Sequence, residues 1–467
     1  MRVLLVESGV MAPEKFVYQC YPPHGLMYLA SYLRNKDPSH RIKILDLMEK
    51  RARPEAAAEL IRDFRPDFMA VHAMSFQASS MHALAAICKS ELPECVVGAG
   101  GPHPSAVPEK VVTDPNIDVA AVGEGEETFL ELVEKMSCGE ELAGTAGTVV
   151  KRDGETIRGP ERPSIADLDT VPFPAWDLLD LSRYFTDVML NQNDITCRRE
   201  ITTVFTSRAC PFGCIFCHNM FGKRFRARSV SNVLDELTLL HREHGIREFH
   251  VIDDCFNCEK GRAEKIMEGV LERGLDVKFA FPNGIRGDRL PDSLLTLMKK
   301  AGVYKLNVGV ETGSPRVQKL IKKGLALDAL KDGVERAAAA GIFTHGFFML
   351  GFPGETRKEM EETVDFACSS RLHTAGFALL SPFPGTEVHR MAVESGKTVE
   401  YDPDDTSYAR VTTNLTAEDD DTLCRMHKKA HRRFYGSPRR VFRIISTMPH
   451  PTDFFRVGLK HFRLKFL

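Results

Sequence analysis

Three cysteines within eight residues are the part of the chain best suited to chemistry. Cys210, Cys214 and Cys217 follow the spacing C-x3-C-x2-C, and the aromatic residue Phe216 precedes the last of them. Soft thiolate ligands select iron–sulfur clusters, zinc or cuprous copper. A structural zinc site needs four ligands, and the nearest further candidate, His218, adjoins Cys217 and is poorly placed to reach the same ion. A four-iron cluster held by three cysteines keeps one iron open, so the loop predicts a catalytic cluster, with a zinc knuckle or a chance grouping of thiols as the alternatives.

From residue 201 onward, strand and helix patterns alternate along the chain. Short apolar runs predict the strands, and amphipathic runs between them predict the helices. The predicted strands are Ile201–Thr206, Arg247–Ile252, Val277–Phe281, Lys305–Val310, Phe343–Leu350 and Gly376–Leu380, and the predicted helices are Val230–Glu243, Arg262–Arg273, Ser293–Ala301, Pro315–Lys322, Leu327–Ala340 and Arg357–Ser369. Six such units predict a partial (βα)6 TIM-like barrel, open on one side. Chemistry in these barrels lies at the carboxyl ends of the strands, where the cysteine loop also lies.

The later strand ends carry further candidate residues. Asp253 and Asp254 follow the second predicted strand, Arg286 lies after the third, Glu311 follows the fourth, and Gly346 begins a glycine-rich segment in the fifth. Each is a weak signal alone, but their order after a C-x3-C-x2-C loop is specific. Together these segments resemble the radical S-adenosylmethionine (SAM) superfamily.

The resemblance implies a role for each segment. The three cysteines would hold a [4Fe-4S] cluster, and Phe216 would belong to the residues around the cofactors. One of the paired aspartates would meet the amino group of SAM, and Arg286 would clamp its carboxylate. Glu311 would accept hydrogen bonds from the ribose hydroxyls. The segment from Gly346 to Glu355 is similar to the family's adenine-side segment.

The first ~145 residues predict a different sheet, because strand and helix signals alternate there at shorter spacing. The predicted strands are Arg2–Val6, Arg41–Leu47, Phe68–His72, Cys95–Gly98 and Val119–Val122, and the predicted helices are Gly25–Arg34, Pro54–Phe64, Ser79–Glu91, Ala106–Val112 and Glu127–Met136. This order predicts an α/β domain with a doubly wound parallel sheet of the flavodoxin or Rossmann type. Such sheets bind ligands beyond the carboxyl ends of their strands. The candidate binding residues at those ends are Ser75, Gly100, Gly101, His103, Glu124 and Gly125.

This half resembles the cobalamin-binding domain that precedes many radical SAM barrels. The matching segments are Pro22-Pro-His-Gly-Leu-Met-Tyr-Leu-Ala30, Gly100-Gly-Pro-His103 and Gly123-Glu-Gly-Glu126. The family's Asp-x-His-x-x-Gly loop is replaced by Glu7-Ser-Gly-Val-Met-Ala-Pro13, so the resemblance implies cobalamin bound without a histidine from this loop. His24, His72 and His103 could lie near it, although ordinary loop or cap positions explain them more simply. A flavodoxin-like sheet that has lost its cofactor is the alternative.

The domain boundaries follow from these patterns. We expect a cobalamin-binding-like domain at 1–145, a linker strap at 146–196, the radical SAM barrel at 197–395 and a basic helical extension at 396–467. The strap contains Trp176, expected to pack on the barrel, and four prolines, Pro160, Pro163, Pro172 and Pro174. In the last predicted helix, Phe455, Leu459, Phe462 and Phe466 share an apolar stripe beside basic residues. This tail either packs on the barrel or makes peripheral contact with a membrane surface.

Composition limits the remaining possibilities. The chain has 467 residues, 43% hydrophobic and 27% charged, and a net charge of −2, which argues against nucleic acid as the main partner. The first residues predict a strand, not an export signal, and no apolar run reaches membrane-spanning length. Twelve cysteines therefore suggest a cytoplasmic protein with free or metal-bound thiols and no disulfide framework.

A second cysteine pair, Cys255 and Cys258, follows the acidic pair. Two small residues that fill the top of the barrel are the simplest interpretation. Metal binding, an auxiliary cluster and redox chemistry are the alternatives.

The resemblance implies a radical SAM enzyme whose reduced cluster cleaves SAM to a 5′-deoxyadenosyl radical, with an electron donor such as flavodoxin or ferredoxin. The radical would attack an unactivated carbon of a small-molecule or lipid-like substrate, followed by methyl transfer from cobalamin or by rearrangement. The alternatives are a radical SAM oxidoreductase or cyclase with a cofactor-free N-terminal domain, and a non-catalytic metal or corrinoid carrier.

Overall fold

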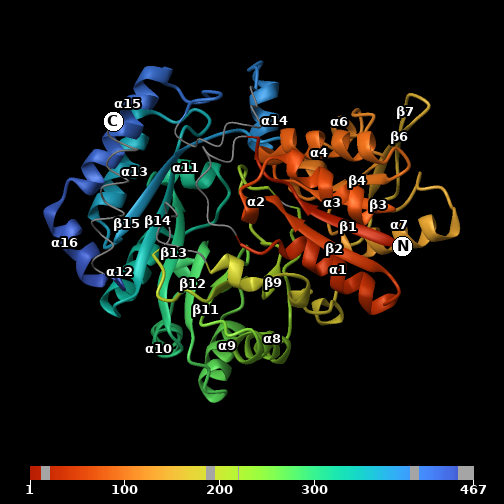
Figure 1. Ribbon diagram of the computed structural model, residues 1–467. Helices are drawn as coiled ribbons and strands as arrows, with labels where there is room; N and C mark the ends of the chain where they lie inside the picture. The colour runs from red at the N-terminus through yellow and green to blue at the C-terminus, as the bar shows by residue number, and fades with distance from the viewer. Residues whose placement is uncertain (12–20, 186–194, 219, 400–409, 451–467) are drawn as a thin grey trace. The chain divides into compact units, whose positions relative to one another are not determined.

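The computed structural model describes residues 1–11, 21–185, 195–218, 220–399 and 410–450. The chain forms two compact units (Figure 1). The first comprises Met1–Tyr184 with Met220–Gly222, and nearly all other described residues belong to the second. The predicted tail helix with Phe455 and Phe466 lies outside the described residues.

The first unit contains a seven-stranded sheet in the order β2-β1-β3-β4-β5-β6-β7. Its strands are β1 Arg2–Glu7, β2 Arg41–Asp46, β3 Phe68–His72, β4 Val96–Gly100, β5 Val119–Ala121, β6 Thr148–Arg152 and β7 Glu155–Arg158. Neighbouring strands from β1 to β5 pair in parallel, which confirms the predicted doubly wound sheet. Because successive side chains point to opposite faces, Leu4 and Val6 enter one hydrophobic core while Val3 and Leu5 enter the other.

The helices of this unit follow the predicted order. They are α1 His24–Lys36, α2 Leu47–Lys50, η2 Pro54–Ala56, α3 Ala57–Phe64, η3 Ser75–Gln77, α4 Ala78–Glu91, α5 Pro102–Ala106, α6 Pro108–Val111, α7 Glu126–Cys138, η4 Leu168–Thr170, η5 Trp176–Leu178 and η6 Leu181–Tyr184. The helix predicted at Ala106–Val112 is wrong in its limits. Pro108 cannot continue a helix from the preceding residues, so α5 ends at Ala106 and a second short helix begins at Pro108.

Strands β6 and β7 form an antiparallel hairpin in the stretch for which only a linker was expected. The hairpin turns at Asp153 and Gly154, which both have positive φ, as the Asp-Gly pair of a tight two-residue turn requires. Further along, Trp176 is 3% exposed and packs edge-on against His24 of α1. This ring contact lies within the first unit, and the packing of Trp176 on the barrel stays a prediction.

The second unit contains a six-stranded parallel sheet in the order β15-β14-β13-β12-β11-β8. Its strands are β8 Ile201–Val204, β11 Glu248–Val251, β12 Lys278–Ile285, β13 Val303–Glu311, β14 Phe343–Leu350 and β15 Thr374–Leu379, with a separate two-stranded ribbon of β9 Ser207–Arg208 and β10 Arg226–Ala227. The order β8 to β15 runs in sequence across the sheet, as strand–helix–strand crossovers require, which confirms the predicted partial barrel.

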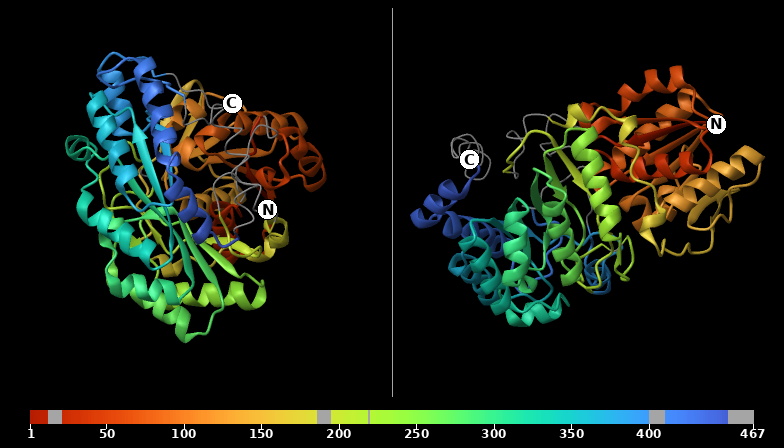
Figure 2. Two further views of the ribbon diagram at one scale, coloured as in Figure 1. Left: turned by 90° about the vertical axis from the view of Figure 1, so that its left-hand side faces the viewer. Right: turned by 90° about the horizontal axis from the view of Figure 1, so that it is seen from below.

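Helices join and cover these strands (Figure 2). They are α8 Val230–Glu243, α9 Lys260–Glu272, η8 Gly287–Arg289, α10 Asp292–Lys300, α11 Pro315–Leu320, α12 Leu327–Ala339, α13 Arg357–Ser369, α14 Glu387–Glu394, α15 Asp420–Tyr435 and α16 Pro438–Thr447. The described part of the basic extension packs on the barrel. Arg440, 5% exposed, donates to the carbonyls of Leu372 and Cys368, and Arg433 pairs with Asp365 of α13. Among the described residues, no helix is long and apolar enough to cross a membrane.

Candidate functional site

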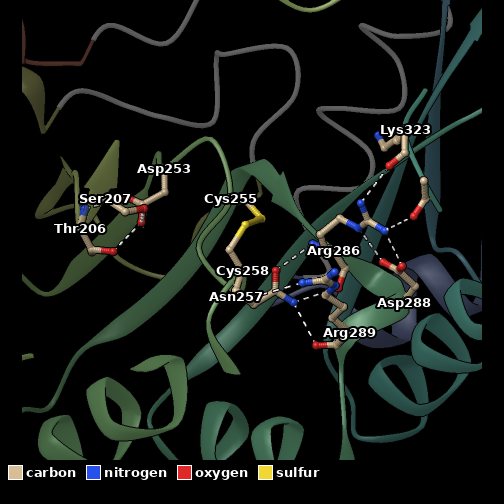
Figure 3. The surroundings of a disulfide bond; sticks show 11 residues. Thr206, Ser207, Asp253, Cys255, Asn257, Cys258, Arg286, Asp288, Arg289 and Lys323 are labelled. Atoms are coloured by element: carbon tan, nitrogen blue, oxygen red, sulfur yellow. Dashed lines mark hydrogen bonds and ion pairs between the residues drawn. A yellow bond between two sulfur atoms is a disulfide. The ribbon is translucent and has the colours of Figure 1, made fainter. Parts of the chain in front are cut away.

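The cysteine loop follows β8 and the short strand β9, and β8 lies next to β11 in the sheet. β8 and β11 pair in parallel, so their carboxyl ends meet at one edge of the sheet. Asp253, at the end of β11, is 1% exposed and accepts hydrogen bonds from the Thr206 amide at 2.6 Å and the Ser207 hydroxyl at 2.6 Å (Figure 3). Asp253 therefore ties the base of the loop to the sheet. Its carboxylate is engaged in the protein, and its predicted contact with the SAM amino group stays a prediction.

Asp254, the other aspartate of the pair, has an exposed side chain. Desolvation by the surrounding chain and the charge of Asp253 raise the pKa of Asp254, while a hydrogen bond from the Ala209 backbone opposes the rise. Of the two aspartates, Asp254 is the one whose side chain faces solvent beside the cysteine loop.

The three thiols of the loop interact with one another. The Cys217 amide donates to the Cys214 carbonyl at 3.2 Å, which makes a tight turn of the last two cysteines. Desolvation, followed by the charges of Cys214, Asp254 and Cys210, raises the pKa of the Cys217 thiol to about 11. In the described part of the chain, no three His, Cys, Asp or Glu side chains are already grouped to hold a metal ion. The donor set nevertheless fits a cluster with three thiolate ligands, which binding would draw together and deprotonate.

Apolar packing anchors the loop between the thiols. Ile215, 1% exposed, joins a buried cluster with Val317, Ile321, Phe352, Leu380 and Val388. The Ile215 amide donates to the Ile321 carbonyl, and its carbonyl accepts from the Val388 amide. The ring of Phe216 lies 5.8 Å from that of Phe352 between centroids. Phe216 thus packs the loop against the segment after β14, and its role beside the cofactors stays a prediction.

Arg286 is held by the protein itself (Figure 3). Its guanidinium pairs with Asp288 and donates to the carbonyls of Lys323 at 3.0 Å and Gly324 at 2.8 Å. It also lies 4.1 Å from the ring centroid of Phe212, inside the cysteine loop. Arg286 therefore braces the cysteine loop, and a bidentate contact with the SAM carboxylate would require these bonds to break.

Sequence reasoning missed the residues that surround Arg286. Asn257 accepts from the Arg286 amide at 2.9 Å and donates to the carbonyls of Arg286 and Arg289. Phe212, which lies between Cys210 and Cys214, faces both guanidinium groups. Position inside the cysteine motif was the only signal for Phe212, and an isolated asparagine gave no signal for Asn257.

Glu311 ends β13 in a left-handed backbone conformation, with φ of 67°. Its carboxylate, in a side chain that is mostly buried, pairs with the Lys323 ammonium at 2.6 Å. A non-glycine residue with positive φ is uncommon, and here it directs the carboxylate at the carboxyl end of β13. Hydrogen bonding to ribose hydroxyls stays a prediction for this residue.

Gly346 lies in the middle of β14 and not at its carboxyl end. A Cβ at this position would come within 2.6 Å of Leu372 and 2.8 Å of Phe348, so the glycine permits close packing on the helix-covered face. The carboxyl end of β14 is instead the turn at Gly351–Glu355. The assignment of Gly346 to cofactor contact has no support from this placement.

Glu355 closes that turn. Its carboxylate accepts from the amides of Gly351 at 2.7 Å and Phe352 at 3.1 Å, and the residue is fully buried. Desolvation is the largest influence and raises the pKa of Glu355 from 4.5 to about 7, against the two amide hydrogen bonds. The carboxyl is therefore easily protonated near neutral pH.

We expect Glu355→Gln to change how stability depends on pH. The pKa of Glu355 is higher in the folded chain than in the unfolded chain, so the folded chain holds this proton more tightly. The stabilisation that results is complete below pH 4.5 and is lost as pH rises through 7. Between pH 5 and pH 8, the free energy of unfolding of the wild type should fall by up to about 3 kcal/mol more than that of Glu355→Gln. Thermal unfolding at several pH values measures this difference. The exposed variant Glu394→Gln is the control, and equal pH profiles for wild type and Glu355→Gln would contradict the pKa shift.

In the first unit, the carboxyl ends of β4 and β5 present open glycine backbone. A Cβ on Gly123, whose φ is 81°, would meet no atom within 4 Å, and one on Gly100 would meet only Ala121 at 3.9 Å. Gly101, with φ of 99°, permits His72 to approach closely, because a Cβ there would come within 2.7 Å of the imidazole. Backbone without side chains is what a large, flat ligand needs for close approach, so this edge fits a corrinoid.

The remaining candidates of this unit have structural contacts. The His72 imidazole pairs with the Glu7 carboxylate at 2.8 Å. Desolvation lowers the pKa of His72, but the charge and hydrogen bond of Glu7 outweigh it, so the pKa is raised. His103 is 7% exposed, and its backbone amide donates to the Ala73 carbonyl. Desolvation lowers the pKa of its imidazole to about 4. Glu124 accepts from the Ile165 amide at 2.9 Å.

Ser75 opens the short helix η3, and Gly125 lies before the first residue of α7. All six predicted residues, Ser75, Gly100, Gly101, His103, Glu124 and Gly125, lie at or just after the carboxyl ends of β3, β4 and β5, and their contacts with cobalamin stay predictions.

Comparison with known proteins identifies a family for the barrel and a family for the N-terminal sheet. Residues 204–367 match the model of the radical SAM superfamily, and residues 16–133 match that of the B12 binding domain. An uncharacterized methyltransferase of Pyrococcus horikoshii is 35% identical over 400 residues, covering 84% of this chain and 83% of the relative. The cytidylyl-2-hydroxyethylphosphonate methyltransferase of Streptomyces wedmorensis is 30% identical over 457 residues, covering 87% and 84%.

A solved structure also shares the fold across both units. OxsB, a cobalamin-dependent SAM radical enzyme, aligns with a TM-score of 0.75 at 17% identity, covering 100% of this chain and 75% of OxsB. The predicted fold class and family are therefore confirmed. The chain belongs to the radical SAM superfamily, as an enzyme with an N-terminal B12-binding domain whose cofactors are a [4Fe-4S] cluster, SAM and cobalamin.

Proposed function

We propose that this enzyme transfers a methyl group to an unactivated carbon of a small molecule. The observation that carries the proposal is the presence of a cluster loop and a B12-binding domain in one chain. Two relatives that share at least 30% identity over more than four-fifths of this chain are named methyltransferases. When bound, the cluster and SAM supply a carbon radical by one-electron cleavage, and cobalamin supplies the methyl group.

The chain's own residues would bind and position these groups. Cys210, Cys214 and Cys217 would hold the cluster, while Asp253 and Phe212 keep their loop in place. Asp254 faces solvent beside the loop and would attract the SAM ammonium. Glu311, oriented by Lys323, would accept from ribose hydroxyls. Holding the reacting groups in line and excluding water are the main contributions of the protein.

The face of the barrel sheet opposite the helices carries both polar and aromatic side chains. On β14, His345, Phe347 and Met349 are half-buried and alternate with the buried residues that face the helices. The His345 imidazole lies 2.8 Å from the Thr374 hydroxyl of β15, and Phe347 packs edge-on against His345. Polar and aromatic groups side by side favour a polar molecule with an apolar or aromatic part over a purely lipid-like one.

The electron donor and the compartment are part of the same proposal. One-electron reduction of the cluster needs an external donor, such as a flavodoxin or ferredoxin. A reducing cytoplasm suits the free thiols of the cluster loop. Peripheral membrane contact would involve the extreme C-terminal residues, outside the described residues. The small net negative charge supports the absence of nucleic acid as a partner.

Methyl loading tests the proposal without knowledge of the final substrate. The anaerobically purified, reduced and cobalamin-loaded enzyme is mixed with SAM that carries a deuterated methyl group. We expect S-adenosylhomocysteine in about a one-to-one ratio with enzyme and deuterium in the corrinoid fraction. Omission of cobalamin is the control. SAM cleavage to 5′-deoxyadenosine without any labelled corrinoid would reject methyl transfer and favour a cyclase or oxidoreductase with an unused N-terminal domain.

A further inference from the structure

A disulfide joins Cys255 and Cys258, directly after β11 (Figure 3). This corrects the expectation that the chain holds only free or metal-bound thiols. Cys255 is 2% exposed, whereas Cys258 is half-buried. Cys258 is therefore the more accessible of the two cysteines to a reductant from solution.

Two features near Cys258 favour a thiolate. Glu259, the N-cap of the 13-residue helix α9, follows Cys258 directly, so the positive end of the helix dipole lies there, opposed by the charge of the exposed Glu259 side chain. Arg289 brings a second positive charge, because its guanidinium donates to the Cys258 carbonyl at 3.4 Å. Cysteines at a helix N-terminus and beside arginine are the ones that exchange with other thiols at neutral pH.

The disulfide closes a short ring around Asn257. Asn257, 1% exposed, makes three hydrogen bonds with the backbone of Arg286 and Arg289, at 2.9, 2.9 and 3.1 Å. The guanidinium groups of both arginines lie over the ring of Phe212, at 4.1 and 5.4 Å from its centroid. Phe212 is two residues from Cys210. A continuous set of contacts thus leads from the disulfide to the cluster loop.

We propose that Cys255 and Cys258 are a redox-active dithiol–disulfide pair that controls the mobility of the cluster loop through Asn257 and Phe212. A dithiol reductant of the thioredoxin class attacks the Cys258 sulfur, and Cys255 leaves as a thiolate that takes up a proton. The second thiol of the reductant then releases Cys258. Two electrons and two protons pass to the pair, and the reductant becomes a disulfide. The redox couple stands by itself, and only its effect on catalysis rests on the proposed function.

The test combines differential alkylation with hydrogen exchange on the full-length protein, prepared oxidised or treated with dithiothreitol. In the oxidised protein, Cys255 and Cys258 should resist alkylation. After reduction, Cys258 should react at least tenfold faster than the buried thiol Cys88. Backbone exchange in segments 210–217 and 286–289 should rise several-fold on reduction, and the double variant Cys255→Ser/Cys258→Ser should show the faster exchange in both conditions.

Two further variants distinguish a specific coupling of the disulfide to the cluster loop from a general increase in the mobility of the protein. Cys138→Ser, which removes an exposed free thiol, should leave the redox response unchanged. Asn257→Ala should keep the alkylation pattern but remove the response of segment 210–217. Full alkylation without reductant, resistance to dithiothreitol, or equal exchange in both redox states would each overturn the proposal. None of these readouts needs SAM cleavage, so failure of the redox proposal can be told apart from failure of the proposed methyl transfer.

Discussion

Replacing any one of Cys210, Cys214 and Cys217 by alanine should abolish reductive SAM cleavage. Three thiolates from one loop are the complete protein ligand set of the predicted cluster, and two ligands do not hold it in place. We expect iron to fall from about four to below one per chain after anaerobic reconstitution. Formation of 5′-deoxyadenosine should fall by about a thousandfold or more. Because the three ligands act as a unit, the triple variant should be no worse than a single one.

Cys138→Ala is the matched control, since Cys138 is a free thiol with an exposed side chain and no ligand spacing. It should keep full iron content and activity. The cysteine variants should also keep the melting temperature of the cluster-free wild type, because Cys210 and Cys214 are only half-buried and Cys217 is exposed. A single cysteine variant that retains four irons and SAM cleavage would show that another residue completes the site.

The sequence predicts the framework of both units because that framework depends on periodicity. Alternating apolar residues place Leu4 and Val6 on one face of the first sheet, and the strand–helix spacing after Ile201 leaves a parallel, sequentially ordered sheet as the simple solution. The cysteine loop is also predictable from sequence, because its C-x3-C-x2-C spacing lies within eight consecutive residues. The hairpin β6–β7 also had a local signal, Asp153-Gly154, which the proline-rich composition of the linker obscured.

The partners of the candidate side chains could not be predicted, because they depend on residues far apart in the chain. Arg286 meets Asp288 nearby, but also the carbonyls of Lys323 and Gly324, which no spacing rule relates to it. The disulfide between Cys255 and Cys258 depends on how the loop after β11 folds. A Cβ on Gly346 would meet Leu372, which no spacing rule relates to it, and cofactor contact stays a prediction for this glycine. Motif position indicates where a residue lies, but only packing shows what it contacts.

Asp253→Ala should cause the largest loss of stability among the site variants. The carboxylate is buried and accepts from the Thr206 amide, the Thr206 hydroxyl and the Ser207 hydroxyl. Arg262 donates to both the carbonyl and the hydroxyl of Thr206, so the buried Arg262 charge would also lose the nearby Asp253 carboxylate. Leaving these donors unpaired should cost about 3 kcal/mol. The melting temperature of the barrel should fall by roughly 6–12 °C.

Asp254→Ala provides the comparison that separates bracing from SAM binding. Its side chain is exposed, so the variant should keep the wild-type melting temperature, while loss of the charge should raise the KM for SAM. In Asp253→Ala, the base of the cluster loop loses its tie to β11, so kcat for SAM cleavage should fall together with the melting temperature. Thermal unfolding and initial rates at several SAM concentrations measure both effects. If Asp253→Ala melted like the wild type and changed only the KM for SAM, then Asp253 would bind the cofactor directly and the bracing role would be wrong.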